Sequence, residues 1–232
     1  MLKQVNEFSR LEQLIGEDSV CLLKNKTVLV LGVGGVGGYV VEALVRSGIG
    51  KIIIVDSDFV DVSNINRQII ALNSTIGMKK VEVLENRVKD INDKCEVIKI
   101  DSFITKENID KLFEHDIDYL VDACDTVLTK QIVIKECLKR NIKFISCMGT
   151  AKKLDPSKLE IVDIRKTYND SLARIIRKFV KDEKIKQKVM VLSSTEVPVK
   201  KEGLGSSAFV PSSAGLLIAS YIIRDFIGYK SK

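Results

Sequence analysis

The chain has 232 residues, 45% of them hydrophobic, and a formal net charge of +6. This length suits one domain or one and a half, and the hydrophobic content is enough for a full core. Its five cysteines are scattered without a C-x-x-C pair, so we expect neither disulfides nor a structural zinc site. The longest apolar stretch, 208–223, falls short of the roughly 20 residues that cross a bilayer. We therefore expect a cytoplasmic protein with no stable membrane span.

Apolar runs and helical patterns alternate along the first 147 residues. The expected strands are 27–31, 51–55, 96–100, 118–122 and 142–147, and the expected helices are 36–47, 78–90, 106–113 and 129–140. Strands that are separated by helices predict crossover connections, and hence a Rossmann-like, mainly parallel sheet with helices on both faces. The strand interiors are rich in Val and Ile without alternation, which is typical of strands buried on both sides.

The pattern changes after Lys158. Residues 159–164 and 188–192 read as strands that flank a basic helix at 171–182, which together predict a small C-terminal α/β appendage with antiparallel strands. Segment 194–207 contains Pro198 and two glycines and is the best candidate for a mobile loop. Residues 212–227 are expected to form a helix that packs back on the main sheet.

A glycine-rich turn, residues 32–37, follows the first strand and opens the first long helix. Glycines in such a turn let the backbone approach a phosphate, and the helix N-terminus offers free N–H groups. Asp56 follows the second strand, 19 residues after Gly37, where an acidic side chain can accept hydrogen bonds from ribose hydroxyls. The sequence therefore predicts a nucleotide site, in which Gly32, Gly34, Gly35 and Gly37 form the turn.

The residues after Asp56 narrow the choice of nucleotide chemistry. A dehydrogenase needs one acid here, whereas this chain adds polar and cationic groups, followed by an acid at the end of another strand: Asp58, Asn64, Asn66, Arg67, Gln68, Lys80 and Asp125. Arg67 and Lys80 can face a polyphosphate, and Asp125 can hold a magnesium ion or order the reacting groups. This set favours a phosphate-cleaving or adenylating enzyme and leaves a nicotinamide-dependent oxidoreductase as the less favoured alternative.

These motifs resemble the adenylation domain of the ubiquitin-activating superfamily, in its ThiF/MoeB/HesA branch, over residues 5–150. The resemblance implies that Asp56 binds the ribose of ATP, that Lys80 and the 63–67 segment contact the phosphates, and that Asp125 holds Mg²⁺ beside the α-phosphate. Arg10 matches an arginine that reaches into the partner subunit's site, which implies a homodimer with shared sites. The full implied ATP-binding set is Gly32, Gly34, Gly35, Gly37, Asp56, Asp58, Ser63, Asn64, Asn66, Arg67, Gln68, Lys80, Asp125 and Thr126, with Arg67, Lys80, Asp125 and Arg10 catalytic.

The second half of the chain is similar to one group in that superfamily, the tRNA threonylcarbamoyladenosine dehydratases. The runs 147–156 and 163–174 carry this resemblance. It implies ATP-dependent cyclisation of N6-threonylcarbamoyladenosine at position 37 of tRNA, with residues 1–150 as the adenylation domain and 151–232 as a tRNA-binding appendage. Relatives with Cys-Pro before the Leu-Ala-Arg run differ from this chain, which has Asp170-Ser171, so a covalent cysteine intermediate is not possible there. An activator of a sulfur-carrier protein stays open as the alternative within the superfamily.

Positive charge concentrates between residues 151 and 190. Twelve cations and six acids lie in this segment, and the difference of +6 equals the net charge of the whole chain. Four cations of the basic helix share one face by their spacing, and Leu172, Ile175, Ile176 and Phe179 are expected on the other. A solvated helix face is the simpler interpretation, but a stripe of this kind can also track phosphates. The predicted contacts with the tRNA anticodon arm are Lys152, Lys153, Arg174, Arg177, Lys178 and Lys181.

Overall fold

A single seven-stranded sheet forms the centre of the computed structural model, which describes residues 5–229. The strand order is β3-β2-β1-β4-β5-β7-β6. In the described residues, every neighbouring pair is parallel except β6 with β7. The strands span Thr27–Leu31 (β1), Lys51–Val55 (β2), Glu96–Ile100 (β3), Tyr119–Asp122 (β4), Lys143–Cys147 (β5), Leu159–Asp163 (β6) and Met190–Ser194 (β7). The expectation of a Rossmann-like, mainly parallel sheet is confirmed.

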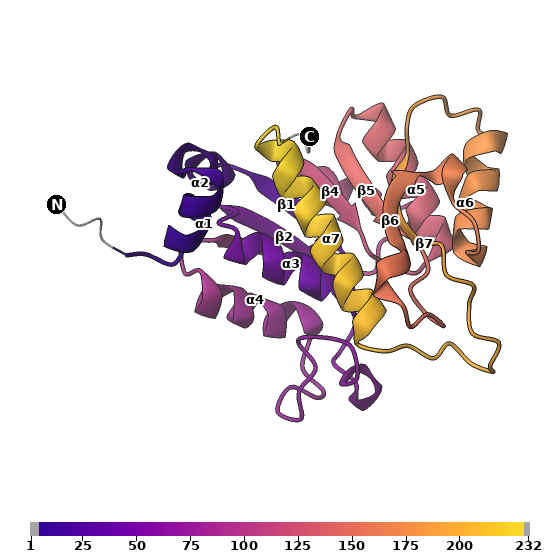
Figure 1. Cartoon of the computed structure of the whole chain (residues 1–232), viewed down its shortest axis with the longest axis horizontal. Coiled ribbons are helices and arrows are strands. Elements are labelled where there is room, and N and C mark those ends of the chain that lie inside the picture. The colour runs from indigo at the N-terminus through magenta and orange to yellow at the C-terminus, as the bar shows by residue number, and fades with distance from the viewer. Residues whose placement is uncertain (1–4, 230–232) are drawn as a thin grey trace.

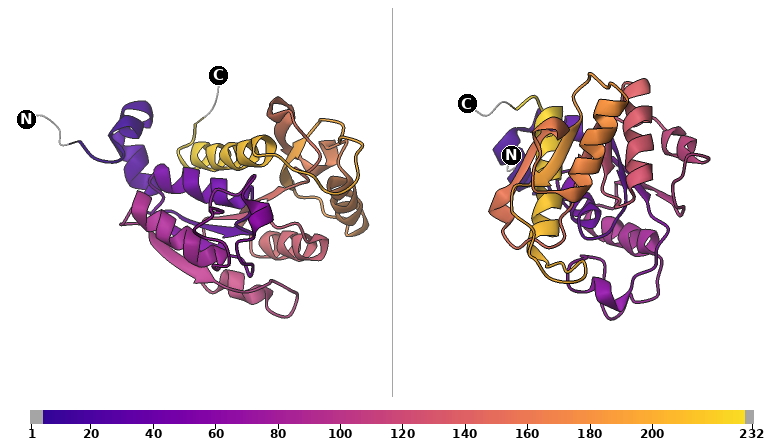
Figure 2. Two further views of the ribbon diagram at one scale, coloured as in Figure 1. Left: turned by 90° about the horizontal axis from the view of Figure 1, so that it is seen from below. Right: turned by 90° about the vertical axis from the view of Figure 1, so that its right-hand side faces the viewer.

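Helices cover both faces of this sheet (Figures 1 and 2). One face carries α3 (Gly37–Arg46), α4 (Lys80–Ile91) and α7 (Phe209–Phe226), and the other carries α5 (Val127–Lys139) and α6 (Ser171–Asp182). Strand side chains alternate between the two cores: Val28 and Val30 pack on the α3 side, and Leu29 and Leu31 on the α5 side. Because both faces are covered, the strands need apolar residues at every position, as their sequences indicated.

The strands of the second half continue the main sheet. β7 pairs in parallel with β5, and β6 then adds to the edge of the sheet in the antiparallel direction. The predicted antiparallel pair is therefore present, but it extends the sheet where the sequence suggested an appendage. The division into two domains near residue 150 stays a prediction.

The C-terminal helix packs on the main sheet, as expected. α7 crosses α3 at Gly215, where an added Cβ would lie only 2.5 Å from the carbonyl oxygen of Val36. The close approach needs glycine at this point. It places the first turn of α7 beside the glycine-rich turn. In the described part of the chain, no helix is both long and apolar enough to cross a membrane.

Two segments differ from the expectation. The helix predicted at 106–113 is a short 3₁₀ helix, Ile109–Phe113, because the Asn108 side chain accepts the Thr105 N–H at 2.7 Å and turns the chain locally. The sequence also gave no indication of two short helices before β1, α1 (Ser9–Ile15) and α2 (Glu17–Leu23). Gly16 separates them with a φ of +87°, so neither is long enough to show a clear periodicity.

Candidate active site

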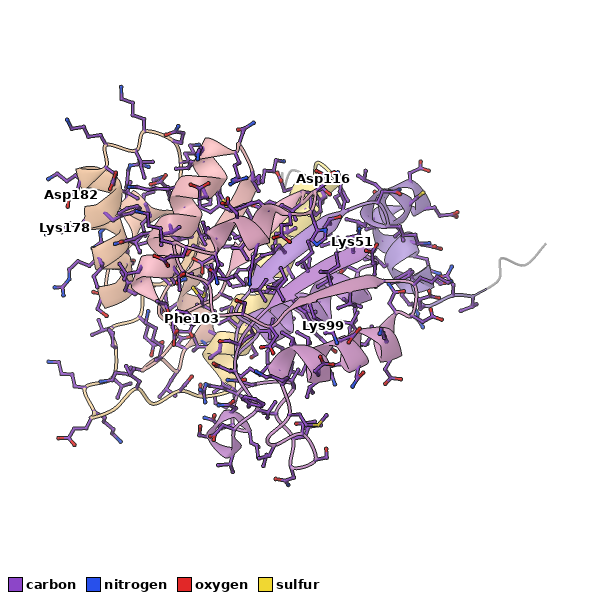
Figure 3. The ribbon with its side chains drawn as sticks, turned by 180° about the vertical axis from the view of Figure 1, so that it is seen from behind. Lys51, Lys99, Phe103, Asp116, Lys178 and Asp182 are labelled. Atoms are coloured by element: carbon purple, nitrogen blue, oxygen red, sulfur yellow. The ribbon has the colours of Figure 1, made fainter. Side chains whose placement is uncertain are left out.

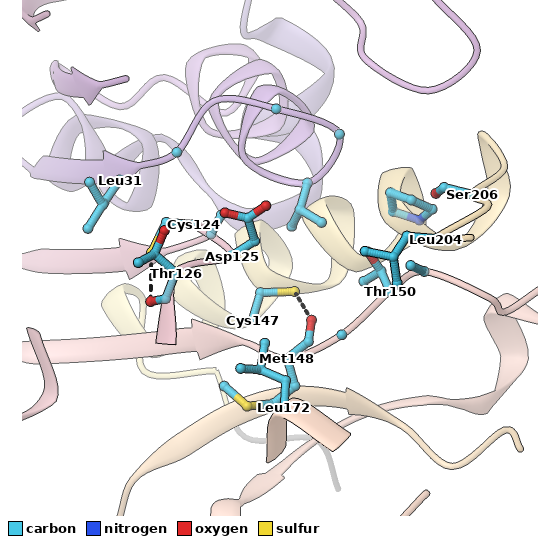
Figure 4. Close-up of a pocket in the computed structure, with 18 of the residues that line it drawn as sticks. Leu31, Cys124, Asp125, Thr126, Cys147, Met148, Thr150, Leu172, Leu204 and Ser206 are labelled. Carbon is cyan, nitrogen blue, oxygen red and sulfur yellow. Dashed lines mark hydrogen bonds between the residues drawn. The ribbon is translucent and has the colours of Figure 1, made fainter. Parts of the chain in front are cut away.

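A cavity of about 760 Å³ opens at the carboxyl ends of the central strands (Figure 4). Parallel strands bring residues that are distant in sequence to this one edge. Most of the predicted ATP-binding residues line the cavity, namely Gly32, Gly34, Gly35, Asp56, Asp58, Asn64, Arg67, Gln68, Lys80, Asp125 and Thr126. Gly37, Ser63 and Asn66 do not line it.

The glycines of the turn have two different structural roles. Gly32 has a φ of +83°, and a Cβ there would lie 2.9 Å from the backbone of Ala123. A Cβ on Gly37 would lie 1.8 Å from the carbonyl oxygen of Gly32. Gly34 and Gly35 instead expose backbone to the cavity. Gly32 and Gly37 therefore close the turn, while Gly34 and Gly35 leave room for a phosphate.

The two acids after β2 link the turn to Lys80. The Asp56 carboxylate accepts the N–H of Val33 at 2.8 Å and the N–H of Asp58 at 2.9 Å. Asp58 in turn pairs with the Lys80 ammonium at 2.7 Å, and Lys80 is only 5% exposed. A carboxylate has about four acceptor positions, so Asp56 keeps capacity for a ribose hydroxyl. The pair holds the Lys80 charge at the cavity wall.

The segment from Ser63 to Gln68 forms a tight polar turn beside the glycines. The 3₁₀ helix Val62–Asn64 begins with a capping box, in which Asn64 accepts the N–H of Asp61. One guanidinium nitrogen of Arg67 donates to the carbonyl of Ser63 at 2.8 Å and to the Asn66 side chain at 2.9 Å. Ser63 and Asn66 thus orient Arg67 from outside the cavity. The remaining Arg67 donors are left for a ligand.

Gln68 carries one of the buried side-chain oxygens that have no hydrogen-bond partner within residues 5–229. Gln68 is 7% exposed and lines the cavity beside Gly34. A buried unpaired polar atom is costly, so it indicates a position where a ligand or a water completes the bonding.

Asp125 projects into the middle of the cavity from the loop between β4 and α5 (Figure 4). It makes no hydrogen bond or ion pair with any described residue, whereas the acids around it are paired. A free carboxylate next to a phosphate site matches the coordination of Mg²⁺, which takes one or two carboxylates together with substrate phosphates. No cluster of three or more His, Cys, Asp or Glu is placed to hold a metal within residues 5–229. Asp125 therefore fits magnesium that arrives with a nucleotide.

A buried network that the sequence did not reveal lies beneath Asp125. Asp122 and Lys130 are both fully buried and pair at 3.1 Å. Asp122 also accepts the Ser146 hydroxyl at 2.5 Å and the Cys124 N–H at 3.3 Å. Burial favours the neutral form of Lys130, but the charge and hydrogen bond of Asp122 together with the neighbouring cysteines outweigh burial and raise the pKa of Lys130. The network fixes the backbone one residue before Asp125. A charged residue at the end of an apolar strand was the only signal in the sequence.

Lys152 and Lys153, which the sequence suggested as surface contacts, both bind carbonyl groups of their own chain. Lys153 is 3% exposed, and its ammonium donates to the carbonyl of Gly149 at 3.0 Å and lies 3.5 Å from the Asp170 carboxylate. Lys152 donates from its ammonium to the carbonyl of Lys201 at 2.7 Å. Both cations hold neighbouring segments of this chain. Burial argues against a tRNA contact for Lys153, whereas for the half-buried Lys152 the contact stays a prediction.

The basic stripe of α6 is only partly free. Arg174, Lys178 and Lys181 point to solvent, and Lys178 lies at the outer edge of the molecule (Figure 3). Arg177 instead donates to the carbonyl and the hydroxyl of Thr167 at 2.7 and 2.6 Å. The buried face consists of Ala173, Ile176 and Val180, while Ile175, which was expected on it, is 43% exposed.

Arg10 lies on α1 and does not line the cavity of its own subunit. α1 packs on α2, which precedes the amino end of β1, whereas the cavity is at the carboxyl end. Within residues 5–229, Arg10 forms no ion pair, and Glu7 pairs with Lys94 at 3.8 Å. Local pairing of Arg10 with Glu7 is therefore not observed.

Comparison with known proteins assigns this chain to a family. Residues 8–230 match the model of the ThiF family. The chain belongs to that family. A tRNA threonylcarbamoyladenosine dehydratase from Bacillus subtilis is 44% identical, over 96% of this chain and 95% of its own length. The Escherichia coli protein of that name is 34% identical, over 89% and 80%. The crystal structure of Escherichia coli TcdA in complex with ATP superimposes with a TM-score of 0.91, at 32% identity over 96% of this chain and 94% of that one.

This ThiF-family site offers no activated protein nucleophile among the cavity-lining cysteines. Burial raises the pKa of the Cys124 thiol far above its usual range and that of Cys147 to about 12. A thiol in that state is a poor nucleophile at neutral pH. Asp170 caps α6 by accepting the Ala173 N–H and also accepts the Gly149 N–H, both at 2.9 Å.

We expect Lys130→Met to lower the free energy of unfolding by about 3–5 kcal/mol, because it leaves the Asp122 charge buried without its partner. Urea unfolding followed by circular dichroism measures the change. Lys135→Met is the matched control on the same helix, since Lys135 is 48% exposed and its pair with Glu183 is worth at most about 1 kcal/mol. Equal losses in the two variants would contradict the role of the buried pair.

Proposed function

We propose that the protein is an ATP-dependent tRNA threonylcarbamoyladenosine dehydratase, which cyclises N6-threonylcarbamoyladenosine at position 37 by adenylating its threonyl carboxylate. One observation carries the proposal. Arg67, Lys80 and the unpaired Asp125 converge with the glycine turn on one cavity, in a chain that is 44% identical to a dehydratase of that name over nearly its whole length. A tRNA substrate supports a cytoplasmic location for the enzyme.

The reaction needs activation because a carboxylate oxygen is a poor leaving group. The carboxylate attacks the α-phosphorus of ATP, pyrophosphate leaves, and a mixed anhydride with AMP forms. A nucleophile in the same substrate then attacks the activated carbonyl and releases AMP, which keeps the carboxylate oxygen. The substrate has then lost the elements of water, and ATP has become AMP and pyrophosphate.

The side chains around the cavity act mainly by position and charge. Arg67 and Lys80 are already oriented by Ser63, Asn66 and Asp58, so little reorganisation is needed when phosphate charge arrives. Asp125 would hold Mg²⁺, which offsets the charge of the phosphates when it is bound. No protein nucleophile takes part, in keeping with the protonated state of the cavity thiols.

A homodimer with composite sites accounts for Arg10. This arginine is exposed and lies away from its own cavity, which supports a role in the cavity of a partner subunit. A patch of exposed apolar side chains near the cavity supports an interface between copies. It consists of Phe59, Val62, Ile65, Leu72, Ile76 and Met78, which are 40–64% exposed. Exposed apolar side chains that gather on one segment, here residues 59–78, are typical of protein contacts.

The free part of the α6 stripe is the proposed contact with the anticodon arm. Arg174, Lys178 and Lys181 are exposed and unpaired among the described residues, and α6 begins at the wall of the cavity. Each phosphate contact releases counterions, which gives affinity without reading the sequence.

The alternative within the superfamily is an activator of a sulfur-carrier protein, which is kept because adenylyltransferases with sulfurtransferase activity are also similar to part of this chain. This similarity suggests that such an activator would have a sulfur-carrier protein as its partner. Pyrophosphate exchange that depends on tRNA, with no carrier protein added, favours the dehydratase.

We expect the purified protein to convert N6-threonylcarbamoyladenosine in tRNA to a product 18 Da lighter, when ATP and Mg²⁺ are present, as measured by mass spectrometry of nucleosides; the mass is that of one water. Asp125→Ala should abolish the conversion, and Arg67→Ala should slow it by about 10² or more. Asp93→Ala is the control acid on the surface. Wild-type protein that consumes no ATP with this tRNA would refute the function.

If Arg10 serves the partner's cavity, Arg10→Ala and Asp125→Ala proteins should each be inactive but regain activity when mixed. Statistical exchange makes about half of the dimers mixed, each with one intact site, so up to about a quarter of wild-type activity returns. Native mass spectrometry verifies the exchange. Verified mixed dimers without activity would show that Arg10 acts elsewhere.

Reversing Arg174 and Lys178 to Glu should weaken tRNA binding and lower its salt slope by roughly 0.7–0.9 for each lost phosphate contact. ATP affinity should stay unchanged. The matched control reverses Lys106 and Lys111, which are exposed on another part of the surface. Filter binding at several salt concentrations measures the tRNA affinity and its salt slope for each variant. Equal effects in the two variants would show that the stripe is only a solvated helix face.

A further inference from the structure

The cavity continues beyond the predicted nucleotide site to a second end, whose lining mixes apolar side chains with polar ones such as Lys153 and Asp170. Its volume of about 760 Å³ is near the top of the range of roughly 300–1,000 Å³ for small-molecule sites. Asp125 lies between the glycine turn and this second end (Figure 4). The far walls come from the turn after β5, the first turns of α6, and residues 195–208, which connect β7 to α7. None of the predicted ATP ligands belongs to these walls.

Large apolar side chains face this second end although they are open to solvent. Leu204 is 83% exposed and Ile175 is 43% exposed, and both line the cavity with Leu172 and Pro198. Figure 4 shows Leu172 and Leu204 on two sides of the space. Single exposed leucines are ordinary, but apolar side chains that gather around one cavity indicate a ligand with apolar faces.

The loop that carries Leu204 is held in place by specific bonds. Lys152 accepts the Val199 N–H and donates its own N–H to the carbonyl of Gly205, both at 2.8 Å. Lys152 does so with a φ of +61°, a conformation that is costly for a residue with a side chain. The Asn66 side chain donates to the carbonyl of Ser206 at 2.9 Å. Residues 200–204 therefore form the tip of a tethered loop beside the phosphate-binding turn.

We infer that this second end of the cavity binds the purine ring of the tRNA nucleotide under modification, with Leu172, Ile175 and Leu204 against its apolar faces. The inference rests on the proposed function. Bases of single-stranded RNA loops are recognised after they are splayed out, and enzymes that modify a base hold it between aromatic or apolar side chains. The charge complements such a ligand, because Arg174 and Lys178 project from the helix that supplies Leu172 and Ile175. The proposed adenylation requires that the N6 substituent of this purine point toward Asp125.

The test measures whether Leu204 contributes to binding of the base at position 37. The probes are two anticodon stem-loop RNAs, one with N6-threonylcarbamoyladenosine at position 37 and one with an abasic site there. Wild-type protein with a non-hydrolysable ATP analogue should prefer the first by about tenfold, the scale of one base contact. Leu204→Asp should lose this preference and keep the affinity for the ATP analogue. Leu204 is largely exposed, so this change leaves the core intact.

Leu128→Asp is the matched control, because Leu128 is 68% exposed near the cavity without lining it. It should retain the preference. A Leu204→Asp protein that still prefers the base overturns the inference, as does one that binds both RNAs equally more weakly, since the loop then contacts only the backbone. Weakened dimerisation of Leu204→Asp in sedimentation, with base preference intact, would assign Leu204 to a protein contact instead. Failure of the wild type to make the lighter nucleoside would refute the function without involving Leu204.

Discussion

The site depends on a tight backbone crossing at the carboxyl end of β1. Gly32 packs against Ala123 of the neighbouring strand end, and Gly37 packs against Gly32 itself, so a side chain at either position would push the turn open. The Asp56 carboxylate then ties this turn to the end of β2 through the Val33 N–H. Because β2, β1, β4 and β5 are parallel neighbours, the residues that follow each of them meet at this crossing. The same geometry brings α7 close at Gly215.

Charge around the cavity is arranged before any ligand binds. Lys80 and Arg67 are oriented by acceptors of their own chain, and Lys130 is neutralised in the core by Asp122. Asp125 lies among these paired groups without a partner of its own among the described residues. A buried ion pair is weak evidence for stability, since its desolvation can cost as much as the attraction returns. Its position under Asp125 instead suggests that it holds the loop geometry that the chemistry needs.

The basic second half divides into two groups with different physical roles. Lys153 and Arg177 bind oxygen atoms of neighbouring segments inside the fold. Arg165 does so at the surface, and Lys152 anchors the loop at 195–208. Arg174, Lys178 and Lys181 remain in solvent. The positive net charge therefore overestimates the number of cations that are free to contact nucleic acid, because some long cationic side chains bind acceptors of their own chain. The exposed apolar groups at the cavity end are the contact that we propose for a base, which charge alone does not supply.

The sequence by itself determined the alternation of strands and helices and the glycine turn. It also singled out Asp56, Arg67, Lys80 and Asp125, which all line the cavity. These signals are local: they depend on the periodicity of burial and on the backbone freedom of glycine, which neighbouring residues encode. Only the tertiary structure decided that β6 and β7 extend the main sheet, that Lys130 pairs with Asp122, and that Lys152 and Lys153 are used within the fold. The Asp122–Lys130 pair and the contacts of Lys152 and Lys153 depend on which segments become neighbours after folding. A lysine has the same charge in a stripe on the surface and in a buried pair, and burial alone separates the two.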